Sequence, residues 1–62
     1  MKTHIEVQPF EHQRGGGCHY AVVGPRGFEA GGCRSHIFEA VAAAFAAARL
    51  HHKCKSFAVV VL

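Results

Sequence analysis

Hydrophobic and polar residues alternate along the start of the chain, over the segment 3–11. Ile5 and Val7 fall on one side of an extended chain, and the positions that flank them are polar. This period of two residues predicts a strand with one buried face. Pro9 cannot donate a hydrogen bond to a strand ladder, so we expect it at a sheet edge or at a bulge.

Two further short strands are predicted, each bounded by glycine. The triplet 15–17 is Gly-Gly-Gly and predicts a turn, which leads into an apolar, β-prone strand over 18–23. The segment 24–27, with the sequence GPRG, predicts a second turn, because proline presets φ and glycine accepts positive φ. The segment 28–30 predicts a third strand, which the glycine pair 31–32 ends.

An alanine-rich segment from His36 to about His52 predicts a helix, because alanine has the highest helix propensity. Ser35 is the expected N-cap, where its hydroxyl can accept a backbone N–H. One helix face is expected to pack on the sheet. That face comprises Ile37, Val41, Ala44, Phe45 and Ala48, with Phe38 beside them. We also expect Tyr20, Phe28 and Phe57 in the core.

The segment 56–62 is apolar after its serine and does not alternate. This pattern predicts a strand that is covered on both faces or paired with a partner. The predicted order of elements is β-β-β-α-β. We therefore expect a single α+β domain over 1–62, a small antiparallel sheet with one helix packed on one face.

Composition sets further limits. A chain of 62 residues forms one domain with a thin core. Half of the residues are hydrophobic, 18% are charged and the formal net charge is +3, a mixture that favours a folded protein over a disordered one. Residues 1–20 lack an apolar secretory-signal region, and the apolar stretch 37–50 is shorter than the ~20 residues that span a bilayer. We expect a soluble, cytoplasmic protein without membrane association.

The chain contains six histidines and three cysteines, which raises the question of a metal site. Cys33-x-x-His36 and His51-x-x-Cys54 resemble two halves of a zinc site. A continuous helix rises ~1.5 Å per residue, which separates the two pairs by more than ~20 Å. We therefore expect no metal site, no cofactor and no Cys33–Cys54 disulfide; a small metal-binding domain remains an alternative.

Candidate catalytic residues are few. Cys18 and His19 are neighbours on a predicted strand, so their side chains should point to opposite faces and cannot act as a nucleophile and its base. The glycine triplet lacks the lysine that would follow in a phosphate-binding loop, and it precedes a strand instead of a helix. We expect no catalytic residues and no enzymatic activity.

Basic residues suggest an alternative function, the binding of RNA or DNA. They lie in or beside predicted loops and around the end of the helix, where they could contact phosphates or an acidic partner. These residues are Arg14, Arg26, Arg34, Arg49, Lys53 and Lys55.

The helix face opposite the predicted core is the strongest functional signal. It carries Ala42, Ala43, Ala46 and Leu50, with Ala40 and Ala47 at its margin and only Glu39 as a strong charge. Small apolar side chains let another backbone approach closely. We expect this face to bind a partner protein or a second copy of the chain, and an apolar strand edge can also recruit a partner by β-augmentation.

The segment 20–41, YAVVGPRGFEAGGCRSHIFEAV, follows the first strand and contains the glycine-rich junction and the helix start. Together with the order of elements, it resembles the N-terminal domain of HicB-type antitoxins. The resemblance implies a partial ribonuclease H-like fold that binds and blocks a small toxin. The chain also looks like small phage or mobile-element inhibitors, such as anti-CRISPR proteins, which cover a surface of a host defence complex. Both resemblances imply a protein-binding inhibitor.

Overall fold

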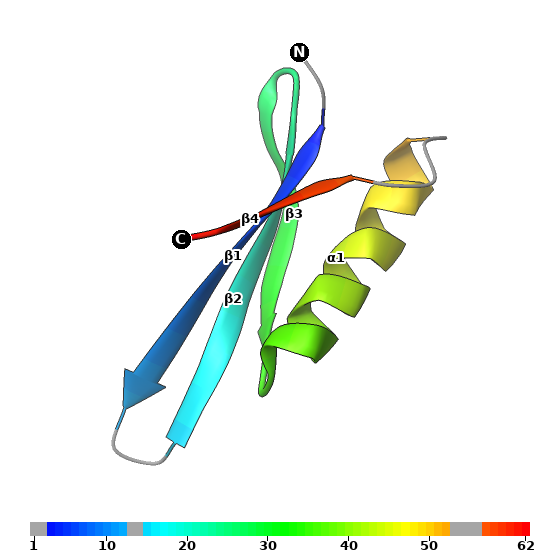
Figure 1. Ribbon diagram of the computed structural model, residues 1–62. Helices are drawn as coiled ribbons and strands as arrows, with labels where there is room; N and C mark the ends of the chain where they lie inside the picture. The colour runs from blue at the N-terminus through cyan, green and yellow to red at the C-terminus, as the bar shows by residue number, and fades with distance from the viewer. Residues whose placement is uncertain (1–2, 13–14, 53–56) are drawn as a thin grey trace.

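The part of the chain that the structure describes contains four strands and one helix. The computed structural model describes residues 3–12, 15–52 and 57–62. The elements are β1 (His4–His12), β2 (Gly15–Gly24), β3 (Gly27–Arg34), α1 (Ile37–His51) and β4 (Ala58–Val61). The sheet has the strand order β3-β2-β1-β4, and α1 packs on one of its faces (Figure 1). The predicted α+β class, the β-β-β-α-β order and the single helix on one face are confirmed.

The sheet is mixed because its last strand returns through the helix. β1, β2 and β3 form an antiparallel meander, whereas β4 pairs parallel to β1, from His4↔Ala58 to Val7↔Val61. Beyond Val7, β1 pairs only with β2 among the described strands, so Pro9 lies on an open edge, as its missing N–H predicts. The β1–β2 hairpin therefore projects past the helix, which gives the molecule its elongated shape of 38 × 17 × 15 Å (Figure 1).

The glycine triplet 15–17 was predicted as a turn and the pair 31–32 as the end of the third strand, and both predictions are wrong. The triplet 15–17 belongs to β2, and the pair 31–32 lies within β3. Aromatic rings on neighbouring strands lie over these glycines: a Cβ on Gly17 would come within 2.6 Å of the Phe10 ring, and one on Gly32 within 3.0 Å of the Tyr20 ring. The rings occupy the space that a side chain would need, so glycine continues the strand there. The turn at 24–27 is confirmed, with Gly27 at φ 112°.

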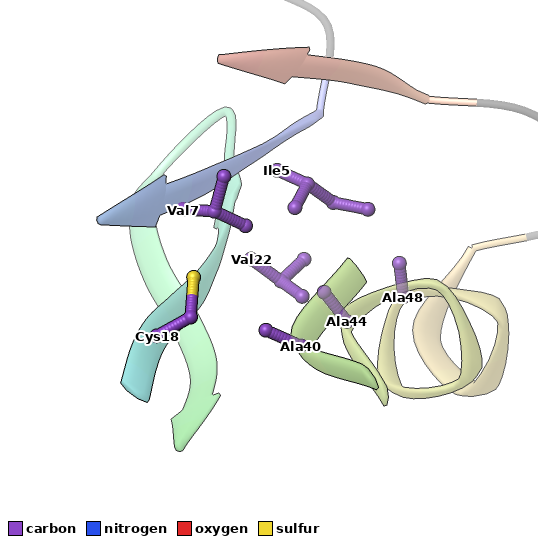
Figure 2. Close-up of a cluster of buried hydrophobic side chains, with 7 residues drawn as sticks. All are labelled: Ile5, Val7, Cys18, Val22, Ala40, Ala44 and Ala48. Carbon is purple, nitrogen blue, oxygen red and sulfur yellow. The ribbon is translucent and has the colours of Figure 1, made fainter. Parts of the chain in front are cut away.

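The core is built from small and β-branched side chains (Figure 2). Among the described residues, seven hydrophobic ones are at most 1% exposed: Ile5, Val7, Cys18 and Val22 from the sheet, and Ala40, Ala44 and Ala48 from the helix. Because the buried helix residues are all alanine, the helix backbone can lie close to the sheet. Larger side chains, among them Tyr20, Ile37, Val41, Phe45 and Phe57, pack against the margin of this core.

The orientation of α1 differs from the prediction in several respects. Phe38 was expected beside the core but is 85% exposed, and Ala40 was expected at the outer margin but is fully buried. Ala43 is half-buried rather than exposed, and Ala47 packs against the core. The N-cap is His36 rather than Ser35, and its side chain forms no capping hydrogen bond within the described residues. No helix in the described part of the chain is long and apolar enough to cross a membrane.

Candidate protein-binding surfaces

The outward side of α1 carries large apolar side chains. Phe38 and Leu50 are each 85% exposed, and Ala42 and Ala46 between them are exposed as well. We call these four residues the outer helix face. The sequence correctly placed Ala42, Ala46 and Leu50 there, but it missed Phe38, which lies four residues before Ala42 in the same series.

The four residues of the outer helix face follow one another at intervals of four. Each step advances the position by a little over one turn, so the series winds slowly around the helix. Phe38 and Leu50 lie about 18 Å apart along the axis, at ~1.5 Å per residue. Glu39 lies in the first turn and Arg49 in the last, where Arg49 also stacks over the Phe45 ring at 5.6 Å. The face therefore offers two large apolar groups separated by small ones.

A second exposed apolar surface lies on β4. Val59, Val60, Val61 and Leu62 are 39%, 42%, 60% and 64% exposed. The helix packs on β1, β2 and β3, and no described strand pairs with the outer edge of β4. The sequence predicted a strand covered on both faces or paired with a partner. The prediction that other parts of the chain cover both faces of β4 is wrong, because β4 is an edge strand whose residues are exposed along its whole length.

The sheet face away from the helix carries aromatic groups, of which His19 and Phe28 are exposed and Phe10 is half-buried. Phe10 on β1 and His19 on β2 are stacked with ring centroids 4.4 Å apart. Phe28 on β3 was expected in the core but is 72% exposed, because it lies opposite Val23, which points away from the helix. A bulge at this point leaves Glu29 without a register partner on β2 and shifts the side on which β3 residues point.

The basic residues do not form one patch in the described part of the chain. Arg34 ends β3 just before α1, whereas Arg49 lies in the last turn of the 15-residue helix, about 20 Å away at ~1.5 Å per residue. Arg26 lies in the turn at the opposite end of β3 from Arg34. Arg34 donates a hydrogen bond to the Cys33 carbonyl at 2.8 Å and lies 5.7 Å from the Tyr20 ring centre. Arg14, Lys53 and Lys55 lie outside the described residues.

The cysteines and histidines are spread over both faces of the sheet. Cys18 is buried under the helix, whereas His19 is exposed on the other face, as the strand period predicts. Cys33 is exposed, and both described cysteines have free thiols. Cys54 lies outside the described residues. Across the ranges that the structure describes, no three His, Cys, Asp or Glu side chains come together as metal ligands.

A polar contact fastens the end of the helix to the sheet. His52, the C-cap of α1, donates from Nε2 to Glu29 Oε1 at 2.7 Å, and Thr3 Oγ1 lies 3.3 Å from the same nitrogen. The His52 ring also meets the Phe57 ring edge to face at 6.3 Å. This cluster joins the β3 bulge, the first described residues and the segment that leads into β4. We call this cluster the clasp, and we interpret its role as structural, because it holds the end of the helix against the sheet.

Two hollows lie on the surface of the described residues. One lies on the sheet face away from the helix, where Glu6, Gln8, His19 and Leu62 line it. The other lies between the β1–β2 hairpin and the start of α1, where its lining includes Ser35 and His36. Both are open to solvent. The exposed apolar surfaces are therefore the more distinctive features of the molecule.

Comparison with protein-family models, with curated proteins and with solved structures found no match for this chain.

Proposed function

We propose that this protein is a small non-enzymatic inhibitor module that acts by covering the surface of a partner protein with its outer helix face. The observation that carries the proposal is the 85% exposure of both Phe38 and Leu50, which lie at the two ends of the exposed series on α1. A folded domain with a thin core normally directs such side chains inward. Here the core uses Ala40, Ala44 and Ala48, and the large groups face solvent.

The energetics of this arrangement suit recognition by a groove. Full burial of a phenylalanine or leucine side chain contributes about 1.5–3 kcal/mol. Ala42 and Ala46, between the two large groups, let the wall of a groove approach the helix backbone. Exposed apolar residues that recur about once per turn along a helix are typical of helix-in-groove binding, and here the two large ones lie more than three turns apart at the ends of such a series. The partner in this proposal is a protein with an apolar groove that is wide enough for one helix.

The biological class of the partner follows from the resemblance. The order β-β-β-α-β supports the likeness to HicB-type antitoxin domains, in which a fold of this kind blocks a small toxin. The likeness to phage anti-defence proteins of the anti-CRISPR type points to a host defence complex instead. Both partners are intracellular proteins that are inhibited by surface coverage, and both require no catalytic group in this chain.

Site-specific photo-crosslinking tests the proposal. A photoreactive amino acid at Ala46 would lie in the interface, whereas the same group at Glu11, exposed on the projecting hairpin, would not. In the native host, we expect one protein to crosslink from position 46 and not from position 11. The purified partner should then bind the wild-type chain and lose its own activity. Crosslinking that is equal from both positions, or absent from position 46, would contradict the proposal.

The aromatic groups on the open sheet face favour a second candidate function, the binding of single-stranded nucleic acid. Phe28 and the Phe10–His19 pair lie on the open sheet face, where bases can stack on aromatic rings. Electrophoretic shift with a short single strand at two salt concentrations tests this candidate. Binding that weakens steeply with salt and is lost in Phe28→Ala, but not in Phe38→Ala, would favour it over protein binding.

A further inference from the structure

The outer edge of β4 has a defined set of backbone groups without a strand partner in the described fold. The Leu62 N–H donates to the Val7 carbonyl at 2.8 Å, so Leu62 directs its backbone groups toward β1. Backbone direction alternates along a strand, so Val60 shares this direction, while Val59 and Val61 direct their N–H and C=O groups away from the sheet. Two residues therefore present two donors and two acceptors at the edge.

These outward groups are self-complementary. We infer that β4 pairs antiparallel with β4 of a second copy, about a two-fold axis at Val60. In this register, Val59 lies opposite Val61 of the second copy, and Val61 lies opposite Val59. Both residues of each pair point outward, so each pair exchanges two hydrogen bonds and the interface contains four. Every outward backbone group of Val59 and Val61 is then satisfied.

The side chains fit the same register. Val60 meets Val60 across the axis, and the pairs on either side also place valine against valine, which is a favourable β-branched combination in sheets. No charged residue lies within 57–62, so the two-fold axis brings no like charges together within the paired strands. The strand carries no charge that would select a different partner, and it lacks the lysine or proline that commonly protects an exposed edge. A second copy is therefore the occupant that this edge fits best.

The geometry of the pair determines the shape of the dimer. An antiparallel edge pair has its two-fold axis perpendicular to the sheet, so the strand order becomes β3-β2-β1-β4-β4-β1-β2-β3 and both helices lie on the same face. A short strand pair buries less than the ~1,200 Å² of typical stable interfaces, so the dimer is weak and depends on concentration. The outer helix face remains free, so the dimer and the partner interface can be tested separately.

Symmetric disulfide trapping tests the register. In a Cys18→Ala, Cys33→Ser, Cys54→Ser background, a single cysteine is placed at position 59, 60 or 61. Residues opposite each other in an antiparallel pair have Cβ atoms about 4.5–5.5 Å apart, near the range that a disulfide spans. We expect Val60→Cys to form a covalent dimer under mild oxidation, because position 60 faces itself. Val59→Cys or Val61→Cys alone should form at least about tenfold less covalent dimer, since position 59 faces position 61 of the second copy. A dimer from position 59 or 61 instead of 60 would overturn the register.

A backbone variant tests the edge itself. Val61→Pro removes an outward N–H and leaves the groups of Val60 and Leu62 that bond to β1. Val61→Thr keeps both the N–H and the β-branched shape, and it serves as the matched control. Sedimentation equilibrium over a range of concentrations should show a monomer–dimer equilibrium for the wild type and for Val61→Thr, and monomer alone for Val61→Pro. A wild type that stays monomeric, or a Val61→Pro that dimerises equally, would overturn the inference. Circular dichroism establishes that each variant is folded.

Discussion

His52 at the end of α1 and Glu29 at the bulge of β3 are joined by a hydrogen bond of 2.7 Å, although 23 residues separate them in the sequence. Both side chains are about three-quarters buried, at 25% and 26% exposure. Glu29 also folds against Gly24, where a Cβ would collide with the Glu29 carboxylate. The bulge, a glycine and the helix end thus form one unit that holds the helix on the sheet.

Glu29→Gln should therefore lower the free energy of unfolding by about 1 kcal/mol, because it weakens a hydrogen bond that involves a charged group in a partly buried place. Glu11→Gln is the matched control, since it also removes one carboxylate, from an exposed position on the hairpin. Urea unfolding measures both. Equal stability for the two variants would show that the clasp contributes nothing.

The close approach of α1 to the sheet gives a second prediction. Ala44 is fully buried against the sheet, whereas Ala42 is exposed on the outer helix face. Ala44→Leu should destabilise the fold by about 1–3 kcal/mol, because the added atoms push the helix away from Val22 and its neighbours. Ala42→Leu, with the same change in helix propensity, should stay within about 0.5 kcal/mol of the wild type. Thermal or urea unfolding of the pair separates the two positions, and equal losses would contradict the packing.

Thiol reactivity gives a third prediction. In a Cys54→Ser background, Cys33 should react quickly with a disulfide reagent because it is exposed. Cys18, which is 1% exposed, should react only as the fold opens. Mass spectrometry of the labelled peptides distinguishes the two sites. Rapid labelling of Cys18 in the native protein would show that the helix does not cover it.

Much of the fold could be predicted from the sequence, because alternation in β1 and the alanine run in α1 are strong signals. The orientation of the helix could not be predicted. Alanine occupies both sides of α1, so hydrophobicity does not distinguish the side that faces the sheet. The large residues looked like core, but the space between helix and sheet admits only alanine, and Phe38 therefore lies outside.

The start of β2 and the end of β3 could not be predicted from the sequence either. Glycine normally indicates a turn, but Gly17 and Gly32 lie within strands, where aromatic rings of neighbouring strands occupy the space that a side chain would need. Only the paired register reveals this arrangement. The exposure of Ala42, Ala46 and Leu50 was predicted correctly, whereas Ala43 of the same predicted set is half-buried. The exposure of β4 and of Phe28 could not be read from their apolar sequence.

The central claim is that the outer helix face covers a partner protein, and its most direct test is the affinity of that partner for a matched pair of double variants. Ala42→Lys with Ala46→Lys places two charges on the outer helix face. Gln8→Lys with Glu11→Gln makes the same +2 change in net charge at two exposed positions of the hairpin. Isothermal titration measures the affinity of each variant for the partner that is identified through crosslinking at position 46. We expect the helix variant to bind this partner at least about a hundredfold more weakly than the wild type does, a loss of ~2.7 kcal/mol in binding free energy. The hairpin variant should bind within about threefold of the wild type. Unchanged affinity of the helix variant, with its fold intact, would contradict the account.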